Sequence, residues 1–334
     1  MRFSMKDVAR EAGVSVATVS NVISGKKYVS PELKEHVLKT IEKMGYKPSR
    51  LAQSLKINRT NFIGLMIPDI TNPYFAEIAR GVESVCIRND LQFFLCNTDG
   101  SIKQERKILD TFISQHVEGI INVAPRMSEA EFHEYLTFLP MVVLDRKIEI
   151  DHPMLDNIYM CNEKGASQVA EYFLEKQFEY FACLSGPEDV LPARKRLKGF
   201  YEKLREAGIG EDYIDVKYGD FKYDSGYNLM KDLLKDLRKP LALFVANDLM
   251  AWGAIEAIKE TELKIPDDIS IVGYDNIFIA KLVVPALTTV NQKKFEAGRT
   301  AMEALYNKIN RSLNHEEQVN HIVELQTELI IRQT

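Results

Sequence analysis

The sequence predicts an α/β protein with an N-terminal three-helix head and two doubly wound parallel-sheet subdomains. Three observations predict this fold. Short helical patterns separated by glycines fill residues 1–48, and apolar runs then alternate with amphipathic helices in two series. The charge also changes sign along the chain: residues 1–60 carry a net +7, although the 334-residue chain has a net charge of −5. A basic head on an acidic body favours a polyanion partner for the head, and a solvated charge cluster is the alternative.

The first two helices of the head are expected within residues 5–24, MKDVAREAGVSVATVSNVIS. Gly13 would stop the first helix in a left-handed turn, and Ser15 would cap the second. Two helices of about two turns around such a turn form the helix-turn-helix pattern. The side chains expected to face inward are Val8, Ala9 and Ala12 in the first helix, and Val19, Val22 and Ile23 in the second.

A third helix is expected between Ser30 and Gly45. Ser30 can cap it, Pro31 suits its first position, and Gly45 would end it. Its inward face is expected to consist of Val37, Leu38, Ile41 and Met44. Three small helices of this kind can close one modest core.

In a helix-turn-helix the second helix enters the DNA major groove with its N-terminal residues at base edges. Val16 and Ala17 can contact thymine methyl groups, and Asn21 can pair with adenine. Phosphate contacts would set the register. The DNA-contacting residues expected in the head are Lys6, Ser15, Val16, Ala17, Thr18, Ser20, Asn21 and Tyr28. The alternative is a three-helix bundle that binds protein.

Residues 47–58, KPSRLAQSLKIN, contain a short helical pattern from Ser49 to Lys56. Ser49 follows a proline and can act as an N-cap, and Leu51 and Leu55 lie one turn apart on one face. A helix of about two turns is marginal in water by itself.

From residue 61 the chain alternates between strands and helices, which predicts parallel sheets covered on both faces. A ligand is then expected at the carboxyl ends of the strands, between the two subdomains. No glycine-rich phosphate loop follows any of these strands, so no dinucleotide or nucleotide cofactor is expected. The expected strands are 62–68, 91–97, 119–124 and 141–145 in the first series, and 180–186, 215–220, 242–247 and 270–275 in the second.

Polar and aromatic side chains follow these strands. Carboxylates, guanidinium groups and amides can hydrogen-bond several hydroxyls at once, and aromatic rings cover the apolar face of a sugar. This chemistry suits a monosaccharide. The alternative is structural: Asp145, Asp275 and Asn247 as helix or strand-end caps, and Phe75 and Phe221 as core residues. The expected ligand-binding residues are Asn72, Tyr74, Phe75, Asp145, Arg146, Arg196, Phe221, Asn247, Asp275 and Gln292.

The stretch DVAREAGVSVATVSNVISGKKYVS, continued by YKPSRLAQSLK, resembles the head of the LacI/GalR family of bacterial transcription regulators. The motifs VAND, VGYDN and PALTTV extend the resemblance over the body, whose expected fold is the type I periplasmic-binding-protein fold. The resemblance implies a hinge helix that orders on a palindromic operator, pairs with its copy in a homodimer and inserts Leu55 into the minor groove. It adds DNA contacts at Ser49, Arg50, Leu51, Ser54, Leu55 and Lys56.

The resemblance also implies that a small-molecule effector closes the two subdomains and changes operator affinity. The ligand-binding set resembles the pocket of ribose-binding proteins. Purine-binding relatives carry a tryptophan where this chain has Arg146, which weakens a purine, although the Asp145–Arg146 pair occurs in relatives that bind other sugars. We therefore expect a repressor of a sugar-utilisation operon that binds ribose or a similar monosaccharide. The alternatives are a purine or nucleoside effector, or help from a phosphoprotein corepressor.

The expected domains are residues 1–48 for DNA binding, 49–60 for the hinge and 61–334 for effector binding and dimerisation. Within the last domain, the N-subdomain is expected at about 61–160 and 292–320, and the C-subdomain at about 161–291 and 321–334. No apolar run approaches the roughly 20 residues of a membrane span and the N-terminus is charged, so a cytoplasmic, nucleoid-associated protein is expected and a secreted solute receptor is not.

Neither a metal site nor catalysis is expected. The four cysteines and six histidines are scattered, without metal-ligand spacing. A glycosidase would need one protonated carboxylic acid near a second carboxylate. Arg146 and Arg196, which are expected beside Asp145 and Asp275, would keep both carboxylates ionised. Binding is therefore expected rather than bond cleavage.

Overall fold

The computed structural model describes residues 3–25, 27–46, 59–314, 316–317 and 319–334. It divides the chain into two compact units, Met1–Asn61 and Phe62–Thr334, and each unit is described by itself below. The short helix predicted at 49–56 lies outside the described residues. No helix within the described ranges is long and apolar enough to cross a membrane.

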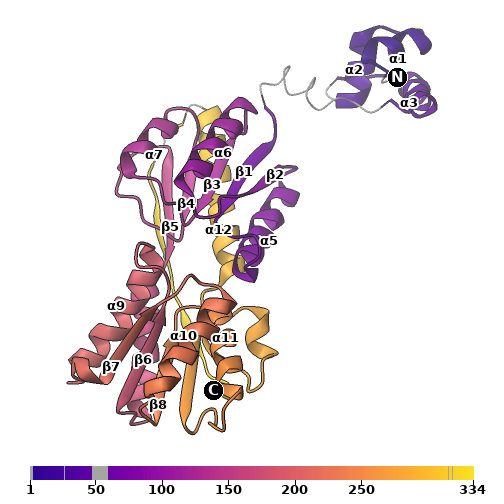
Figure 1. The fold of residues 1–334 in the computed structure, drawn as a ribbon. Coiled ribbons are helices and arrows are strands. Elements are labelled where there is room, and N and C mark those ends of the chain that lie inside the picture. The colour runs from indigo at the N-terminus through magenta and orange to yellow at the C-terminus, as the bar shows by residue number, and fades with distance from the viewer. Residues whose placement is uncertain (1–2, 26, 47–58, 315, 318) are drawn as a thin grey trace. The chain divides into compact units, whose positions relative to one another are not determined.

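The head contains α1 (Met5–Glu11), α2 (Val16–Ser24) and α3 (Pro31–Met44) (Figure 1). The predicted caps are confirmed. The Ser15 and Ser30 hydroxyls accept from the backbone N–H of the third residue of α2 and of α3, and Gly13 and Gly45 take φ values of 63° and 59°. These caps satisfy groups that a helix end cannot satisfy by itself.

The head's core is built from inward faces of all three helices. Its buried members are Val8, Ala9, Ala12, Val19, Val22, Val37 and Tyr46. The prediction for Leu38 is wrong, because this side chain is exposed and Thr40 is buried instead. With Val37 facing inward, the next residue points about 100° around the helix, whereas the residue three positions on returns to the core.

The second unit contains two six-stranded sheets. The first sheet has the order β11-β5-β4-β3-β1-β2, and with its helices it forms the first subdomain (Figure 1). All the strands predicted for the first series are present, and helices alternate with them. The elements are β1 (Phe62–Ile67), α5 (Pro73–Arg88), β2 (Gln92–Asn97), α6 (Ile102–Ser114), β3 (Gly119–Val123), α7 (Glu129–Leu136), β4 (Met141–Leu144) and β5 (Leu155–Met160), with α12 (Lys294–Leu313) and β11 (Ile322–Leu325) added from the end of the chain.

The second sheet has the order β12-β10-β9-β8-β6-β7 and forms the second subdomain with its helices. The strands predicted for the second series are present here, and helices alternate with them. The elements are α8 (Asn162–Glu175), β6 (Tyr180–Ser185), α9 (Leu191–Glu206), η1 (Glu211–Tyr213), β7 (Ile214–Tyr218), α10 (Tyr223–Leu233), η2 (Leu234–Asp236), β8 (Leu241–Val245), α11 (Asp248–Lys259), β9 (Ile269–Asp275), η3 (Phe278–Lys281), β10 (Thr288–Asn291) and β12 (Glu328–Ile330).

The chain passes between the subdomains three times, after β5, after β10 and between β11 and β12. The predicted C-subdomain range 321–334 is therefore wrong for β11, which pairs in parallel with β5 of the first sheet. Only β12 joins the second sheet, antiparallel to β10. The strands β5, β10, β11 and β12 are not among the eight strands predicted from the sequence.

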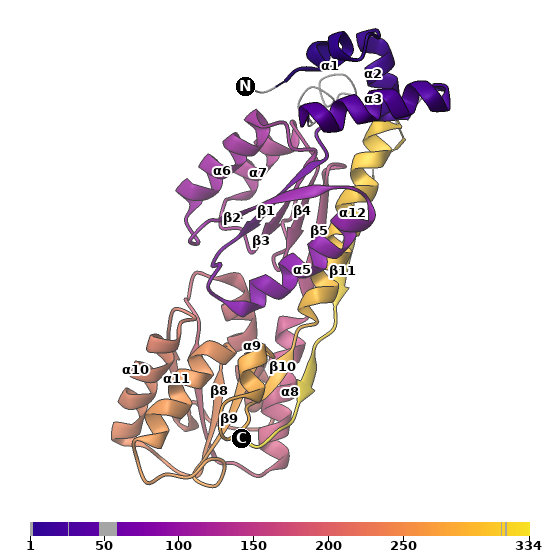
Figure 2. The ribbon, with the colours of Figure 1, turned by 90° about the vertical axis from the view of Figure 1, so that its right-hand side faces the viewer.

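The helices α5 and α12 pack side by side on one face of the first sheet (Figure 2). Two glycines permit their close approach. A Cβ atom on Gly298 would lie 2.0 Å from the Ile78 carbonyl oxygen, and one on Gly81 would lie 2.2 Å from the Phe295 carbonyl oxygen. Both contacts are with backbone, so any side chain at these positions would separate the helices.

Candidate effector site and nucleic-acid interface

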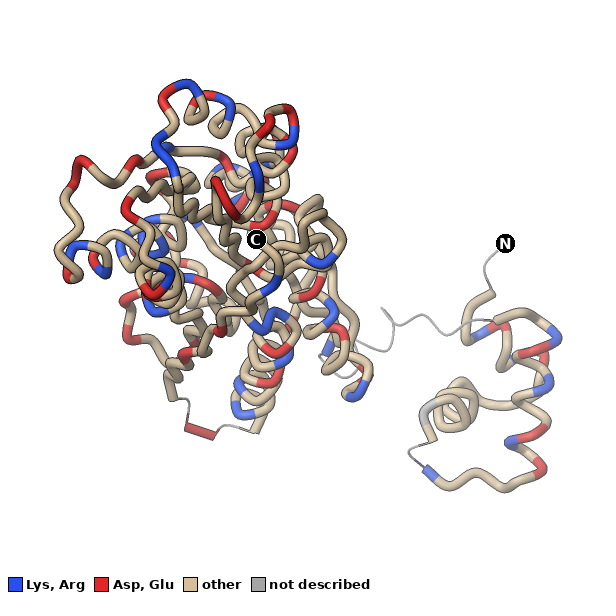
Figure 3. Tube along the Cα trace, turned by 90° about the horizontal axis from the view of Figure 1, so that it is seen from below, with Lys and Arg blue, Asp and Glu red and all other residues tan. Residues whose placement is uncertain are grey.

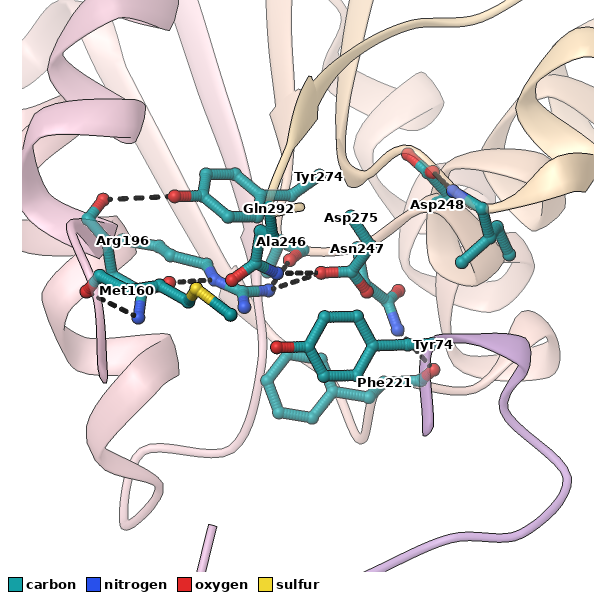
Figure 4. Close-up of polar contacts among 12 residues, drawn as sticks. Tyr74, Met160, Arg196, Phe221, Ala246, Asn247, Asp248, Tyr274, Asp275 and Gln292 are labelled. Carbon is teal, nitrogen blue, oxygen red and sulfur yellow. Dashed lines mark hydrogen bonds and ion pairs between the residues drawn. The ribbon is translucent and has the colours of Figure 1, made fainter. Parts of the chain in front are cut away.

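The carboxyl ends of the strands bring most of the predicted ligand-binding residues together where the two subdomains meet (Figure 4). Tyr74 lies in the first turn of α5 and Asp145 follows β4, so the first subdomain contributes a hydroxyl and a carboxylate. The second subdomain contributes Arg196 from α9 and Asp275 from the end of β9. Gln292 follows β10. We call these five residues the polar cluster.

Arg196 is the centre of the polar cluster and is only 4% exposed. Its Nε donates to Asn162 Oδ1 at 2.8 Å, and its Nη1 donates to the Ala246 carbonyl oxygen at 2.7 Å and lies 3.3 Å from Asp275 Oδ1. The guanidinium carbon lies 4.0 Å from the centre of the Tyr274 ring, a cation–π distance. These contacts hold the guanidinium in one orientation.

The carboxylate of Asp275 accepts a hydrogen bond from Gln292 Nε2 in addition to its contact with Arg196. Burial raises the pKa of Asp275 to about 6, although the positive charges of Arg196 and Lys294 oppose the rise. Lys294 also donates to the Asp275 backbone oxygen at 2.6 Å. Because Lys294 opens α12, this bond connects the polar cluster to the second passage between the subdomains.

In the first subdomain, Tyr74 donates to Asp145 Oδ2 at 3.4 Å. Burial raises the pKa of Asp145 despite the attraction of Arg196. Burial thus outweighs the nearby positive charges at both carboxylates, although a pKa of about 6 still leaves Asp275 ionised at pH 7.

Several buried polar atoms near these strand ends have no hydrogen-bond partner among the described residues. They are Asp145 Oδ1, Gln292 Oε1 and both amide atoms of Asn122. Buried polar atoms in folded proteins nearly always have partners, so these atoms mark where a ligand's hydrogen-bonding groups can bind. Asn122 was missed because it lies inside β3. The sequence feature that could have identified Asn122 is a single amide side chain near the carboxyl end of the otherwise apolar run GIINVA.

The hydrogen bonds of Arg146 go to a loop and not to members of the polar cluster. Its Nη1 donates to the carbonyl oxygens of Pro125 and Met127, each at 2.8 Å, within the loop that follows β3. The cause is local: Asp145 has a φ of 63°, and this left-handed residue turns the chain between the two side chains. Arg146 therefore anchors a loop of the first subdomain.

The remaining predicted residues have structural contacts of their own. Asn72 caps α5, and Asn247 caps α11 while its Nδ2 donates to the Phe221 carbonyl oxygen at 2.8 Å. The Phe221 ring packs against Gly186, where a Cβ atom would lie 2.3 Å away. Phe75 packs against the core of the first subdomain. The structural alternative thus applies to Asn247 as a helix cap, and to Phe75 and Phe221, which pack against the cores of the first and second subdomains.

In the head, the N-terminal end of α2 presents an apolar, accessible surface. Val16 is 41% exposed, and Ala17 is exposed beside it. The Ser15 hydroxyl accepts from the Thr18 backbone N–H at 3.0 Å, so the predicted DNA contacts of these two residues would share groups with the helix cap. Lys6 and Tyr28 are exposed, and Ser20 and Asn21 are half-buried. Basic and acidic positions both occur along the head (Figure 3).

Six predicted DNA contacts lie outside the described residues: Ser49, Arg50, Leu51, Ser54, Leu55 and Lys56. They remain predictions.

Two parts of the chain match known protein families. Residues 4–49 match the family model described as bacterial regulatory proteins, lacI family, and residues 170–334 match the periplasmic binding protein-like domain. The HTH-type transcriptional repressor PurR of Photobacterium profundum is 35% identical over 333 residues, which cover 99% of this chain and 98% of that protein. The ribose operon repressor of Escherichia coli K12 is 36% identical over 311 residues, 92% of this chain and 93% of that protein.

The chain belongs to the lacI family of bacterial regulatory proteins. Solved structures of this family agree with its fold. The lac repressor dimer bound to operator and the anti-inducer ONPF matches with a TM-score of 0.87 at 25% identity, over 100% of this chain and 99% of that one. A LacI family transcriptional regulator from Enterococcus faecium with bound ribose matches with a TM-score of 0.72 at 26% identity, over 81% of this chain and 97% of that one. This lacI-family chain is a DNA-binding transcriptional repressor.

Proposed function

We propose that this lacI-family repressor controls a sugar-utilisation operon and that ribose or a similar monosaccharide is its effector. The effector would bind at the polar cluster, favour the closed arrangement of the two subdomains, and so change operator affinity. A ligand shifts such an equilibrium only through its differential affinity for the two arrangements. The cluster meets this condition because its members come from both subdomains.

The unpartnered oxygens Asp145 Oδ1 and Gln292 Oε1 are the observation that carries this proposal. Both are buried acceptors, one in each half of the polar cluster, so the ligand that suits them donates hydrogen bonds in two directions. A monosaccharide does this with its hydroxyl groups. The bound ribose in the E. faecium relative and the name of the E. coli relative support the same class of ligand.

The exposed start of α2 supports binding of the head to DNA. Val16 and Ala17 are accessible for contact with thymine methyl groups, in the position that helix-turn-helix proteins use in the major groove. From the family resemblance, we propose that residues 49–56 form the hinge and that Leu55 enters the minor groove. Leu55→Ser should then abolish operator retention in a gel shift while effector binding is unchanged, and retained operator binding would contradict the role of Leu55.

We propose that the protein is a homodimer that binds a palindromic operator. The edge strand β2 and its neighbours carry exposed apolar side chains, including Ile87 of α5 at 72% and Phe94 of β2 at 42%. Natural proteins cover edges of this kind, and a second copy of the chain would do so here. The lac repressor is described as a dimer on its operator. Ile87→Glu should give a monomer in sedimentation velocity, and an unchanged dimer would contradict this surface.

Calorimetric titration of the full chain with ribose, other monosaccharides and purine bases tests the effector. We expect heat with a monosaccharide, and an at least tenfold weaker affinity for Asp145→Asn. A hydrogen bond to a charged group contributes about 1.5–3 kcal/mol. The control is Asp151→Asn, an exposed carboxylate change outside the polar cluster, which should bind as the unaltered chain does. Equal affinities of the Asp145→Asn and control proteins would contradict the site.

The same titration separates the alternatives. Heat with a purine base and none with any sugar would favour the purine effector. A gel shift with genomic fragments then tests the response, because the proposed effector must change the retention of a specific fragment. Retention that appears only after a phosphorylated partner protein is added would favour the corepressor-assisted alternative.

A further inference from the structure

The loop that follows β3, residues 124–128, is anchored from two sides within the first subdomain. The buried Glu105 carboxylate of α6 accepts from the backbone N–H groups of Arg126 at 2.9 Å and Met127 at 3.2 Å. Arg146 donates to the carbonyl oxygens of Pro125 and Met127. Contacts within the first subdomain therefore fix the backbone at Arg126, independently of any contact that the Arg126 side chain makes.

Arg126 uses this anchored position to reach the other subdomain. Its guanidinium forms an ion pair with Asp189, which lies in the loop between β6 and α9 of the second subdomain. This loop also contains Gly186, the glycine that contacts the Phe221 ring, and it leads into the helix that carries Arg196. We call Arg126 and Asp189 the inter-subdomain ion pair.

Two like charges, one in each subdomain, oppose a close approach of the subdomains. Arg194, exposed in the first turn of α9, contributes to a lowered pKa of Arg146 across the subdomain boundary, after burial as the largest cause. The positive charges of Arg146 and Arg194, one in each subdomain, therefore repel each other weakly. Asp189 supplies a negative charge on the second subdomain at this place, so it is positioned to offset the repulsion when the subdomains close.

We propose that the inter-subdomain ion pair biases the unliganded protein toward the closed arrangement and thereby sets the effector concentration at which the repressor responds. The effect on the response rests on the proposed function, whereas the bias itself does not. Arg126 is 33% exposed and Asp189 is 65% exposed, so the pair is solvated and its contribution is modest. A pair of this kind changes a closed-to-open ratio by about two- to fivefold.

Double electron–electron resonance on the unliganded protein measures this ratio. Spin labels are placed on cysteines introduced at Glu134 of α7 and Glu206 of α9, two exposed residues in different subdomains. The half-buried Cys96 is replaced by serine, and the native Cys86, Cys161 and Cys183 are buried. The labelled chain is co-purified with an excess of chain that lacks the two introduced cysteines, so that distances within one chain dominate.

We expect Arg126→Asp and Asp189→Arg each to raise the open population about two- to fivefold, and the double exchange to restore the starting distribution. A salt concentration of about 0.5 M should shift the unaltered protein in the same direction, because salt screens exposed charges. The matched control is Arg205 with Glu211, an exposed ion pair at 2.9 Å within the second subdomain. The same exchanges there should leave the distribution unchanged.

Single variants with the starting distribution, or a double exchange that fails to restore it, would overturn the proposal. Titration of the same variants with ribose distinguishes this failure from failure of the proposed effector. Ribose binding with no population shift in any variant would reject the ion pair and keep the effector. A population shift in a protein that binds no monosaccharide would keep the proposal for the ion pair and reject the monosaccharide effector.

Discussion

Loss of the Lys308 ammonium group should strongly destabilise the body of the repressor. Lys308 on α12 and Asp156 on β5 form an ion pair at 3.0 Å, and both side chains are only 2% exposed. The ammonium group also donates to the carbonyl oxygens of Pro153 at 2.7 Å and Val319 at 3.0 Å. The pair therefore attaches the long helix to the first sheet and to the segment that precedes β11.

The magnitude follows from what Lys308→Met would leave behind. The methionine side chain can fill most of the space. Among the described residues, the buried Asp156 carboxylate would then keep the His321 backbone N–H, at 2.7 Å, as its hydrogen-bond partner. Breaking one side of a buried ion pair costs about 3–5 kcal/mol. The orphaned carbonyl oxygens add to this loss, so we expect a value of about 4–5 kcal/mol.

Urea unfolding followed by circular dichroism measures the loss in the free energy of unfolding. The control is Lys198→Met, because the ion pair of Lys198 with Glu163 is exposed and should contribute at most about 1 kcal/mol. A second variant, Lys308→Met with Asp156→Leu, should recover much of the loss, since removal of both charges leaves none buried alone. A loss below about 1 kcal/mol for Lys308→Met alone would refute the reasoning.

Three further predictions concern pH, helix packing and DNA contact. Burial raises the pKa of Asp248 to about 8, so the stability that its protonated form contributes is full below the usual pKa of 3.8 and is lost as the pH rises toward 8. Asp248→Asn should therefore flatten the dependence of the free energy of unfolding on pH between 5 and 8, measured by urea titration. An unchanged slope would contradict this. Gly298→Ala should lower the free energy of unfolding by about 2 kcal/mol or more, because the new Cβ atom would overlap the backbone of α5. The control Gly210→Ala, whose Cβ atom would have its nearest neighbour at 3.7 Å, should change it by no more than about 0.5 kcal/mol in thermal melts. Val16→Ser should weaken operator binding by about 1–3 kcal/mol in gel shifts with unfolding unchanged, and full affinity would exclude this contact.

Features that depend on neighbours in the sequence could be predicted for this chain. Ser15, Ser30, Gly13 and Gly45 act within one turn of the helix end that they define, so their roles do not depend on the rest of the fold. The strands of the two series could be predicted in the same way, because buried parallel strands read as continuous apolar runs.

Features that depend on distant partners could not be predicted. The strand β11 has four residues with an alternating exposed and half-buried pattern, and its place is determined by pairing with β5, which lies more than 150 residues earlier. Asn122 reads as one polar residue within an apolar strand. Arg146 follows a strand, as the ligand-binding residues do, but the left-handed backbone of Asp145 directs it to a loop. Only the three-dimensional structure separates this arginine from Arg196.

The shared strands at the end of the chain have a consequence for biosynthesis. Because β11 and β12 add an edge to each of the two sheets, neither subdomain can complete its hydrogen-bonded ladder while the ribosome still holds residues after 320. Both halves of the body must therefore finish together, once residues 322–330 are free to pair, rather than one after the other along the chain. A premature stop codon just before Ile322 would leave two incomplete sheets, and we expect cellular proteases to remove such a product.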